Sequence, residues 1–418
     1  MKDLSGKKIV VAGFSLSGLA TARFLQKRKA KLFITDSTDT DQIRENLCRL
    51  EDKDFKVEFG VHSKNFLKES EFIVVSPGIS NDSLLVSMAR DLKIPLISEI
   101  ELAYRFCPCD IIAITGSTGK STVTSLVADM FNRSGRRSFA LGNIGNVFSD
   151  YVDSLNKDDL VCLEVSSFQL EHIEKFRPKV SVVLNISSNH LDRHKDLEEY
   201  LSIKKRIYAN QKKEDFLLLN YQDELLKGCE KEAVSQIIFF NRPQDKPLNP
   251  NYSVMLEIGS IFGIDKNVIS QAFKEFKVLE HRLEFVKQVK GIDFINDSKS
   301  TTVDSAIWAF ENIDKPIVLI AGGRDKGVNY KKLLPLLSKK ARAIVLIGEA
   351  KDKIKTSFSD LSIAIKYADN LKDAVSQSVN LAKKGDCILL SPMCSSYDMF
   401  KNFQERGNVF KQQVLSIK

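Results

Sequence analysis

The segment from Ile114 to Thr122, ITGSTGKST, has the residue types of a phosphate-binding loop. Its glycines let backbone N–H groups turn inward around phosphate oxygens, and the start of the helix that follows adds favourable dipole charge. Lys120 can reach the β- and γ-phosphates of ATP, and Ser121 can bind Mg²⁺. A strict P-loop has a glycine five residues before Gly119, where this chain has Ile114, so the loop is a shortened variant. A plain glycine-rich turn is the alternative interpretation.

Further polar side chains downstream could take part in the same chemistry. Glu164 ends an apolar run, and a carboxylate at the carboxyl end of a parallel strand lies in the ligand crevice, where it can hold Mg²⁺ or cap a helix. His190 and Asp192 follow another apolar run and could contact a metal or a substrate. Their spacing is not that of a zinc site, and a structural histidine is the alternative. Lys204 belongs to a helical stretch, residues 200–208, which by itself predicts a solvated basic face.

A second glycine-containing turn, VAGFSLSG, follows the first apolar run and resembles a dinucleotide-binding fingerprint. Ser15 replaces the middle glycine, at the point where a pyrophosphate must approach closely, so the support for NAD is weak. A helix N-terminus that faces a nucleotide diphosphate, with Asp36 on a base or ribose, is consistent with the pattern. A tight strand–helix turn without a ligand is the alternative.

The last third of the chain carries cationic side chains near the ends of apolar runs. Arg282, Lys299 and Lys326 could bind phosphate or carboxylate groups. The motifs that contain the two lysines each follow an apolar run, so we expect them to face one crevice. The segment 390–403, LSPMCSSYDMFKNF, has serines at a helix start, which bind anions or, more simply, cap the helix.

These residues must be positioned by strands and helices that alternate along the whole chain. Short apolar runs predict strands at residues 9–12, 32–35, 72–75, 111–115, 160–165, 180–184, 216–219, 317–321, 343–347 and 387–390. Helix-length segments lie between many of them, for example residues 17–27 and 121–133. Such alternation predicts an α/β fold with mostly parallel sheets.

Two breaks in this alternation divide the chain. One follows a helix-like stretch near residues 99–105, and the other lies near residues 276–281, after the proline-rich patch 243–250. We predict an N-terminal Rossmann-like domain, a central P-loop ATPase-like domain with a mostly parallel sheet, and a C-terminal Rossmann-like domain. Their predicted limits are residues 1–97, 98–279 and 280–418.

The composition is that of an ordinary globular protein. The 418 residues include 62 Lys plus Arg and 54 Asp plus Glu, a net charge of +8, without the basic, aromatic-rich stripe that binds nucleic acid. A small anionic substrate accounts for the positive net charge equally well. The sequence has no stretch of about 18 uncharged apolar residues, so no membrane-spanning helix is predicted. No signal peptide is recognisable, and seven scattered cysteines fit a reducing compartment. We expect a cytoplasmic monomer that binds neither nucleic acid nor membrane.

Taken together, the motifs resemble those of the Mur ligases, the ATP-dependent amide-forming enzymes of peptidoglycan synthesis. The resemblance spans nearly the whole chain. Its motifs occur in the family's order at residues 115–122, Glu164, His190, His281–Arg282 and Asp297–Lys299. The C-terminal segment, residues 391–410, and GNIG at residues 142–145 are similar to those of the D-glutamate-adding members.

This resemblance implies an enzyme that adds D-glutamate to UDP-N-acetylmuramoyl-L-alanine through an acyl phosphate, with ATP as co-substrate. It implies domains that bind the UDP-substrate, ATP and the amino acid, in chain order. It also implies two Mg²⁺ ions and a carbamylated Lys204, because Lys-x-Arg-Ile-Tyr surrounds that residue in register. Carbamylation turns a cation into an anion that can ligate Mg²⁺, and this replaces the solvated-face interpretation.

The resemblance assigns residues to roles. The catalytic residues would be Lys120, Glu164, His190 and Lys204, and the metal ligands would be Ser121, Glu164, His190 and Lys204. ATP would contact Gly116, Ser117, Thr118, Gly119, Lys120, Ser121, Thr122, Asn251, Arg282 and Asp297. The UDP-substrate would contact Leu16, Ser17, Asp36, Asn143, Ser166, Gln169 and His190. D-Glutamate would contact Lys299, Thr301, Lys326, Ser396 and Phe403.

One region departs from the family pattern. Family members have His-Asn-x-x-Asn near the adenine, whereas residues 247–251 read PLNPN, so only the second Asn, Asn251, is in place. Other functions stay open: a related ligase with another acceptor, such as a folylpolyglutamate synthase-like enzyme, or a nucleotide-binding protein that has lost catalysis. A dehydrogenase is a weaker alternative, which Ser15 opposes.

Overall fold

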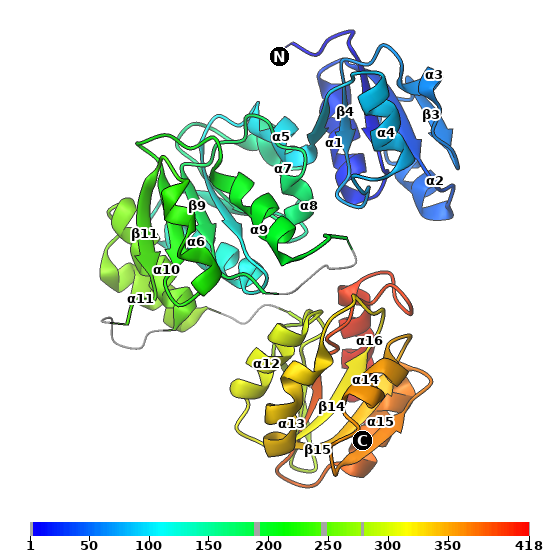
Figure 1. The fold of residues 1–418 in the computed structure, drawn as a ribbon, viewed down its shortest axis with the longest axis vertical. Helices are drawn as coiled ribbons and strands as arrows, with labels where there is room; N and C mark the ends of the chain where they lie inside the picture. The colour runs from blue at the N-terminus through cyan, green and yellow to red at the C-terminus, as the bar shows by residue number, and fades with distance from the viewer. Residues whose placement is uncertain (1–2, 188–192, 244–248, 277–279, 418) are drawn as a thin grey trace. The chain divides into compact units, whose positions relative to one another are not determined.

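The computed structural model describes residues 3–187, 193–243, 249–276 and 280–417. Within them the strands form three sheets, which Figure 1 shows with helices packed around them. This confirms the predicted three-domain α/β fold with mostly parallel sheets. No helix in the described part of the chain is both long and apolar enough to cross a membrane.

The chain divides into two compact units. One contains residues 1–186 and 198–276, with sheets 1 and 2, and the other contains residues 187–197 and 277–418, with sheet 3. The domain limits predicted at residues 97 and 279 stay a prediction.

Sheet 1 is a parallel sheet of five strands in the order β3-β2-β1-β4-β5. The strands are β1 (Lys8–Ala12), β2 (Lys31–Asp36), β3 (Phe55–Phe59), β4 (Phe72–Val75) and β5 (Leu96–Ser98). The helices are α1 (Leu16–Lys27), α2 (Asp41–Cys48), α3 (Lys64–Leu67), α4 (Leu84–Asp91) and α5 (Glu99–Tyr104). Val10 and Ile73, from neighbouring strands, pack with Leu85 and Val86 of α4 in one apolar core. Because β1 and β2 are parallel neighbours, their carboxyl ends lie side by side at one edge of the sheet.

Sheet 2 has six parallel strands in the order β11-β10-β9-β6-β8-β7. The strands are β6 (Asp110–Thr115), β7 (Ser138–Gly142), β8 (Leu160–Glu164), β9 (Val180–Val183), β10 (Phe216–Asn220) and β11 (Gln236–Phe240). The helices are α6 (Lys120–Arg133), α7 (Phe148–Tyr151), α8 (Ser167–Leu170), α9 (Leu197–Lys205), α10 (Pro250–Ile261) and α11 (Lys266–Glu275). Short 3₁₀ turns complete it at Val152–Ser154, Arg206–Tyr208, Glu224–Leu226 and Cys229–Lys231.

The position of β6 decides where the chemistry of sheet 2 can occur. β6 lies between β8 and β9, so the segments that leave all three strands meet at the carboxyl edge of the sheet. Beneath that edge, Val127 of α6, Met255 of α10 and Ile269 of α11 pack against the apolar face of the strands. The helix that follows the phosphate loop is thus anchored in the core, which fixes the loop at its start.

Sheet 3 has six strands in the order β12-β13-β17-β14-β15-β16. The strands are β12 (Glu284–Val289), β13 (Ile292–Asn296), β14 (Ile317–Gly322), β15 (Ala341–Ile347), β16 (Ala364–Tyr367) and β17 (Cys387–Leu390). The helical segments are α12 (Val303–Glu311), a 3₁₀ turn (Tyr330–Leu333), α13 (Leu334–Lys340), α14 (Lys351–Ser357), α15 (Leu371–Leu381) and α16 (Phe403–Leu415). Only β12 runs antiparallel, beside β13; the other described pairs are parallel.

Alternate residues of the central strands of sheet 3 enter two different cores. Leu319 faces a core that includes Phe310 of α12, whereas Ile320 faces a core that includes Val375 of α15 and Phe410 of α16. Helices therefore cover both faces of this sheet, as in a doubly wound fold.

Candidate active site

The phosphate loop leads from β6 into α6, as the sequence predicted. Gly119 takes a left-handed conformation (φ 82°) at the N-cap of α6, and no side chain caps the helix there. The Nζ atom of Lys120 donates hydrogen bonds to the carbonyl oxygens of Gly116 (2.9 Å) and Ser117 (3.1 Å). Ser121 is buried in the first turn of α6. The uncapped N–H groups of that turn are a site for phosphate oxygens.

Asn185, just past β9, hydrogen-bonds the middle of the loop. Its Oδ1 atom accepts from the backbone N–H groups of Ser117 (3.0 Å) and Thr118 (2.9 Å), and its Nδ2 atom donates to the Thr118 carbonyl (3.2 Å). The sequence analysis assigned no role to this residue, which comes directly after the apolar run 180–184. Its position just past a strand places it at the carboxyl edge of the sheet, but its sequence context does not indicate its partners.

Glu164 ends β8, next to the strand that carries the loop, with Ile114 as its register partner. It is buried, and its Oε1 atom accepts a hydrogen bond from Asn143 Nδ2 (2.9 Å). Its Oε2 atom is buried without a hydrogen-bond partner among the described residues. A buried carboxylate oxygen that accepts no described hydrogen bond suits a hard cation such as Mg²⁺. The donor set at this edge therefore fits the metal that the resemblance implies.

Lys204, in the last turn of α9, is fully buried, so the solvated basic face predicted from the helix alone is wrong for this residue. Its Nζ atom donates to Thr115 Oγ1 (3.1 Å) and the Gly116 carbonyl (3.0 Å) and lies 4.7 Å from the centre of the Tyr200 ring. Burial lowers the pKa of this ammonium group well below its ordinary value, and Lys120 lowers it further, while Glu164 acts in the opposite direction. The structure thus brings Lys204 to the base of the phosphate loop.

The other residues expected to contact the substrates near sheet 2 lie at separate positions. Ser166 and Gln169 form a capping box at the start of α8, in which each side chain bonds the other residue's backbone N–H. Asn143 lies beside Glu164 through the hydrogen bond described above. His190 lies outside the described residues. Asn251 is in the first turn of α10, and its backbone N–H donates to Asn249 Oδ1 (2.9 Å), with no described bond to the phosphate loop.

In sheet 1 the turn after β1 brings together the three residues expected to bind the UDP moiety. Leu16 and Ser17 begin α1, and Leu16 is 65% exposed. Asp36 ends β2, and its Oδ2 atom accepts the backbone N–H of Phe14 (2.8 Å). Asp36 therefore holds the turn that carries Leu16 and Ser17.

In sheet 3 a buried carboxyl group lies where β13 ends. Asp297 accepts hydrogen bonds from the Leu283 backbone N–H (3.2 Å) and from Ser391 Oγ (3.0 Å). Burial raises the pKa of Asp297 to about 7, although Arg282 and these hydrogen bonds act to lower it. The Nε atom of Arg282 is buried without a hydrogen-bond partner among the described residues. The expected ATP residues Arg282 and Asp297 thus lie together in this unit.

The expected D-glutamate residues lie on loops and a helix start around the same sheet edge. The Lys299 Nζ atom is 5.2 Å from the centre of the Phe403 ring. Ser396 is buried in the loop after β17, Thr301 follows β13, and Lys326 follows β14. The sequence analysis assigned no role to Arg406, which is fully buried in α16 and donates to the carbonyls of Ser298 (2.8 Å) and Cys394 (3.2 Å). It thereby ties the loops of Lys299 and Ser396 to the helix of Phe403.

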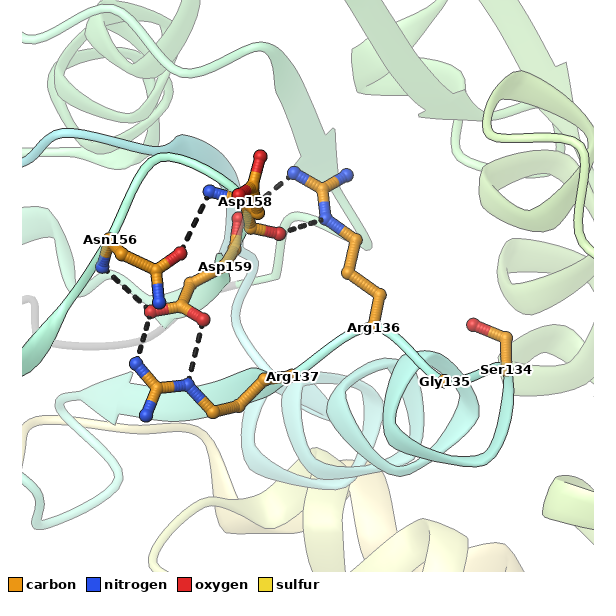
Figure 2. Close-up of a pocket in the computed structure, with 7 residues that line it drawn as sticks. All are labelled: Ser134, Gly135, Arg136, Arg137, Asn156, Asp158 and Asp159. Atoms are coloured by element: carbon orange, nitrogen blue, oxygen red, sulfur yellow. Dashed lines mark hydrogen bonds and ion pairs between the residues drawn. The ribbon is translucent and has the colours of Figure 1, made fainter.

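A surface pocket lies at the other edge of sheet 2. Figure 2 shows it at the amino ends of β7 and β8, where the guanidinium of Arg137 faces the carboxylate of Asp159 and Arg136 reaches backbone carbonyls. Arg137 and Asp159 form an ion pair there, and the Arg136 guanidinium donates to the backbone carbonyls of Asp158 and Asp159. Because Glu164 ends β8 at the carboxyl edge, this pocket is separate from the candidate site.

Comparison with known proteins assigns the chain to a family. Residues 7–98 match the Mur ligase MurD-like N-terminal domain, residues 114–256 the Mur ligase middle domain, and residues 281–394 the Mur ligase glutamate ligase domain. The chain therefore belongs to the Mur ligase family.

Two full-length relatives within the family share one enzyme name. The chain is 38% identical to the UDP-N-acetylmuramoylalanine--D-glutamate ligases of Thermoanaerobacter sp. (strain X514) and Caldanaerobacter subterraneus subsp. tengcongensis, and each alignment covers 100% of both chains. The fold is similar to that of UDP-N-acetylmuramate-alanine ligase MurC from Thermotoga maritima, with a TM-score of 0.61 at 18% identity, over 99% of this chain and 100% of that one.

Proposed function

We propose that this protein joins the amine of D-glutamate to the carboxyl group of UDP-N-acetylmuramoyl-L-alanine and converts ATP to ADP and phosphate. The observation that carries the proposal is the meeting of Lys120, Glu164 and Lys204 at the carboxyl edge of sheet 2. The full-length relatives, named for this reaction, supply the choice of substrates. The reaction belongs to the synthesis of peptidoglycan precursors.

The chemistry requires activation of a carboxylate, which is a poor electrophile at neutral pH. Transfer of the γ-phosphoryl group of ATP to that carboxylate forms an acyl phosphate and releases ADP. The amine of D-glutamate attacks the acyl carbon, and the tetrahedral intermediate collapses to the amide and phosphate. In this scheme the ammonium group of Lys120 stabilises charge on the transferred phosphoryl group, and the N–H groups of the first turn of α6 orient the phosphates.

We propose that the metal binds the Oε2 atom of Glu164, which accepts no described hydrogen bond. Ser121 and Glu164 would hold Mg²⁺, and the ion would neutralise charge on the phosphate oxygens. A second Mg²⁺ is proposed near Lys204 and His190. The protein's own part is to fix these ligands on β8, α6 and α9 before the substrates bind.

Lys204 is proposed to react with CO₂. Its buried Nζ atom would attack the carbon, an N–C bond would form and a proton would be released, giving a carbamate anion. The support is geometric: the amine is fully buried, and among the described residues it hydrogen-bonds only a hydroxyl and a carbonyl and has no carboxylate within ion-pair distance. A carbamate carbon resonance in ¹³C NMR, present with ¹³CO₂ and absent from Lys204→Met, is the expected result. Spectra identical for the two proteins would contradict it.

The remaining assignments follow the same scheme. Lys299 and Lys326 would offset the two carboxylates of D-glutamate, with Thr301, Ser396 and Phe403 completing that subsite. Leu16, Ser17 and Asp36 would contact the UDP moiety, and Asn143, Ser166, Gln169 and His190 the muramoyl-alanine moiety. Gly116 to Thr122, Asn251, Arg282 and Asp297 would contact ATP.

The test is phosphate release with Mg²⁺ and ATP, adding UDP-N-acetylmuramoyl-L-alanine and D-glutamate singly and together. We expect release only with both substrates, and none with Lys120→Ala. Release with another acceptor alone would instead favour a related ligase. Intact ADP binding without release would favour a nucleotide-binding protein that has lost catalysis.

A further inference from the structure

We propose that Asn185 is a positioning residue that braces the shortened phosphate loop from the neighbouring strand. The inference rests on the proposed ATP site and adds a residue to it. A longer P-loop has two more residues between its glycines, whereas here only Ser117 and Thr118 separate Gly116 from Gly119. Asn185 supplies from outside the loop the hydrogen bonds that hold these two residues.

The contacts are two-sided, which favours a permanent brace. The Oδ1 atom accepts from the N–H groups of Ser117 and Thr118, while Nδ2 donates to the Thr118 carbonyl at 3.2 Å. The backbone carbonyl of Asn185 also accepts from Ser117 N–H (2.9 Å). A phosphate group could imitate the acceptor but not the donor, so the carboxamide matches the loop backbone rather than standing in for a ligand.

The loop packs directly against the end of the strand that precedes Asn185. Ser117 is buried, and a Cβ added to Gly116 would come within 3.0 Å of Leu184 Cβ, so the loop lies directly on the end of β9. Without the carboxamide, the half-buried Thr118 N–H would lose its acceptor, at a cost that a shifted loop would relieve. A shifted loop would no longer present Lys120 and the first turn of α6 to a nucleotide.

The brace assigns different tasks to the two halves of the loop. The N–H groups of Ser117 and Thr118 hold the loop to Asn185, whereas the N-cap residue Gly119 and the first turn of α6 carry no side-chain cap. The backbone N–H groups that bind the nucleotide phosphates would therefore be those of the second half. Asn185 would then affect ATP and ADP without touching either one.

The experiment measures ADP binding by calorimetry with the full-length chain and Asn185→Ala. The matched control is Asn220→Ala. Asn220 ends β10, and its side chain donates to the Leu184 carbonyl (3.0 Å). Its replacement by alanine therefore removes a similar hydrogen bond at the same sheet edge, without removing a bond to the loop. We expect ADP binding to weaken roughly tenfold in Asn185→Ala and to stay within about twofold of wild type in the control.

Steady-state kinetics separate positioning from general damage. In Asn185→Ala the KM for ATP should rise while the KM for D-glutamate stays unchanged, and its melting temperature should match that of Asn220→Ala. Equal ADP affinity in wild type and Asn185→Ala would overturn the inference, as would equal weakening in the control. Tighter ADP binding would show that Asn185 competes with phosphate, which also overturns it. Failure of the wild-type protein to bind ADP would contradict the proposed function itself.

Discussion

The turns after β1 and β6 share one plan and differ in the groups that hold them. Each leaves a parallel strand and enters a helix whose N-cap, Ser15 or Gly119, provides no side-chain cap. In each, a side chain from the end of a neighbouring strand accepts a backbone N–H. Asp36 bonds Phe14 at 2.8 Å in sheet 1, and Asn185 bonds Thr118 at 2.9 Å in sheet 2.

The difference lies in charge. The brace of the phosphate loop is neutral and the first residue of its helix is Lys120, whereas the brace in sheet 1 is a carboxylate and the first helical residue is Leu16. A carboxylate beside the loop N–H groups would repel a triphosphate, while a carboxamide gives the same geometry without the charge. The two turns thus share a backbone geometry and differ in the charge that they present to a ligand.

Replacing the first residue of each helix gives the largest expected contrast. Lys120→Ala should lower kcat/KM by about a thousandfold, because the cation that stabilises the transferred phosphoryl group is lost. Leu16→Ala, at the same position of α1, should change mainly the KM for the UDP-substrate. Phosphate-release kinetics measure both. Comparable losses of kcat in the two variants would remove the distinction between the turns.

Exchanging the charges of the two braces tests the comparison directly. Asn185→Asp keeps the acceptor but places a negative charge beside the phosphates and removes the donor to Thr118, so ADP binding should weaken by on the order of a hundredfold. Asp36→Asn should leave ADP binding unchanged. Calorimetric titration gives both values, and salt should partly restore the Asn185→Asp complex. A loss smaller than that of Asn185→Ala would show that charge is unimportant there.

The two turns should also differ in their tolerance of an added methyl group. A Cβ on Gly18 would come within 2.1 Å of the Gly13 carbonyl oxygen, whereas one on Gly119 would meet Leu184 Cδ1 at 3.5 Å. We expect Gly18→Ala to lower the free energy of unfolding by about 2 kcal/mol or more, because backbone must move. Gly119→Ala should cost about 1 kcal/mol, from its left-handed conformation alone. Urea unfolding followed by circular dichroism ranks the two, and the reverse order would contradict the packing described.

A second carboxylate that accepts a backbone N–H just past a strand extends the comparison through pH and carries the smallest effect. Asp297 bonds the Leu283 N–H, and burial raises its pKa to about 7, above the value of about 3.9 for an exposed aspartate. The folded state therefore holds the proton more tightly, so this residue's contribution to stability is lost as pH rises towards about 7 and is constant above it. Melting temperatures at pH 5 to 8 should show wild type falling relative to Asp297→Asn up to about pH 7. A constant difference would refute the assignment.

The sequence predicted the interior strands far better than the edges of the sheets. Runs such as Val10–Ala12 in β1 and Leu217–Leu219 in β10 are buried throughout and form unbroken apolar stretches, so they were recognised. Every edge strand was missed. The sequence of β3, FKVEF, alternates apolar and charged residues, which is a weak signal over five residues, and the strand exposes Lys56 and Val57 and buries none of its residues. Among interior strands only β13 was missed, because its short sequence, IDFIN, also alternates.

The candidate site was predictable where local sequence determines geometry. The phosphate loop and Glu164 follow directly from a strand and its end. Lys204 does not, because its burial depends on the packing of α9 against Thr115 and Gly116, which helical periodicity cannot indicate; only the family resemblance identified it. Asn185 and Arg406 act through bonds to distant backbone, and no local pattern predicts such partners. The roles assigned to the site residues stay predictions.

The hydrogen bonds of Asn185 also bear on protein engineering. The residues that this side chain holds lie 67 and 68 positions earlier in the chain. A nine-residue graft of ITGSTGKST into another scaffold would carry the lysine and the glycines but leave two amides without their acceptor. The smallest segment pair that contains both the donors and the acceptor is the adjacent strands β6 and β9 with the loops that follow them. Searches for transferable phosphate-binding parts should therefore compare strand pairs rather than loop motifs.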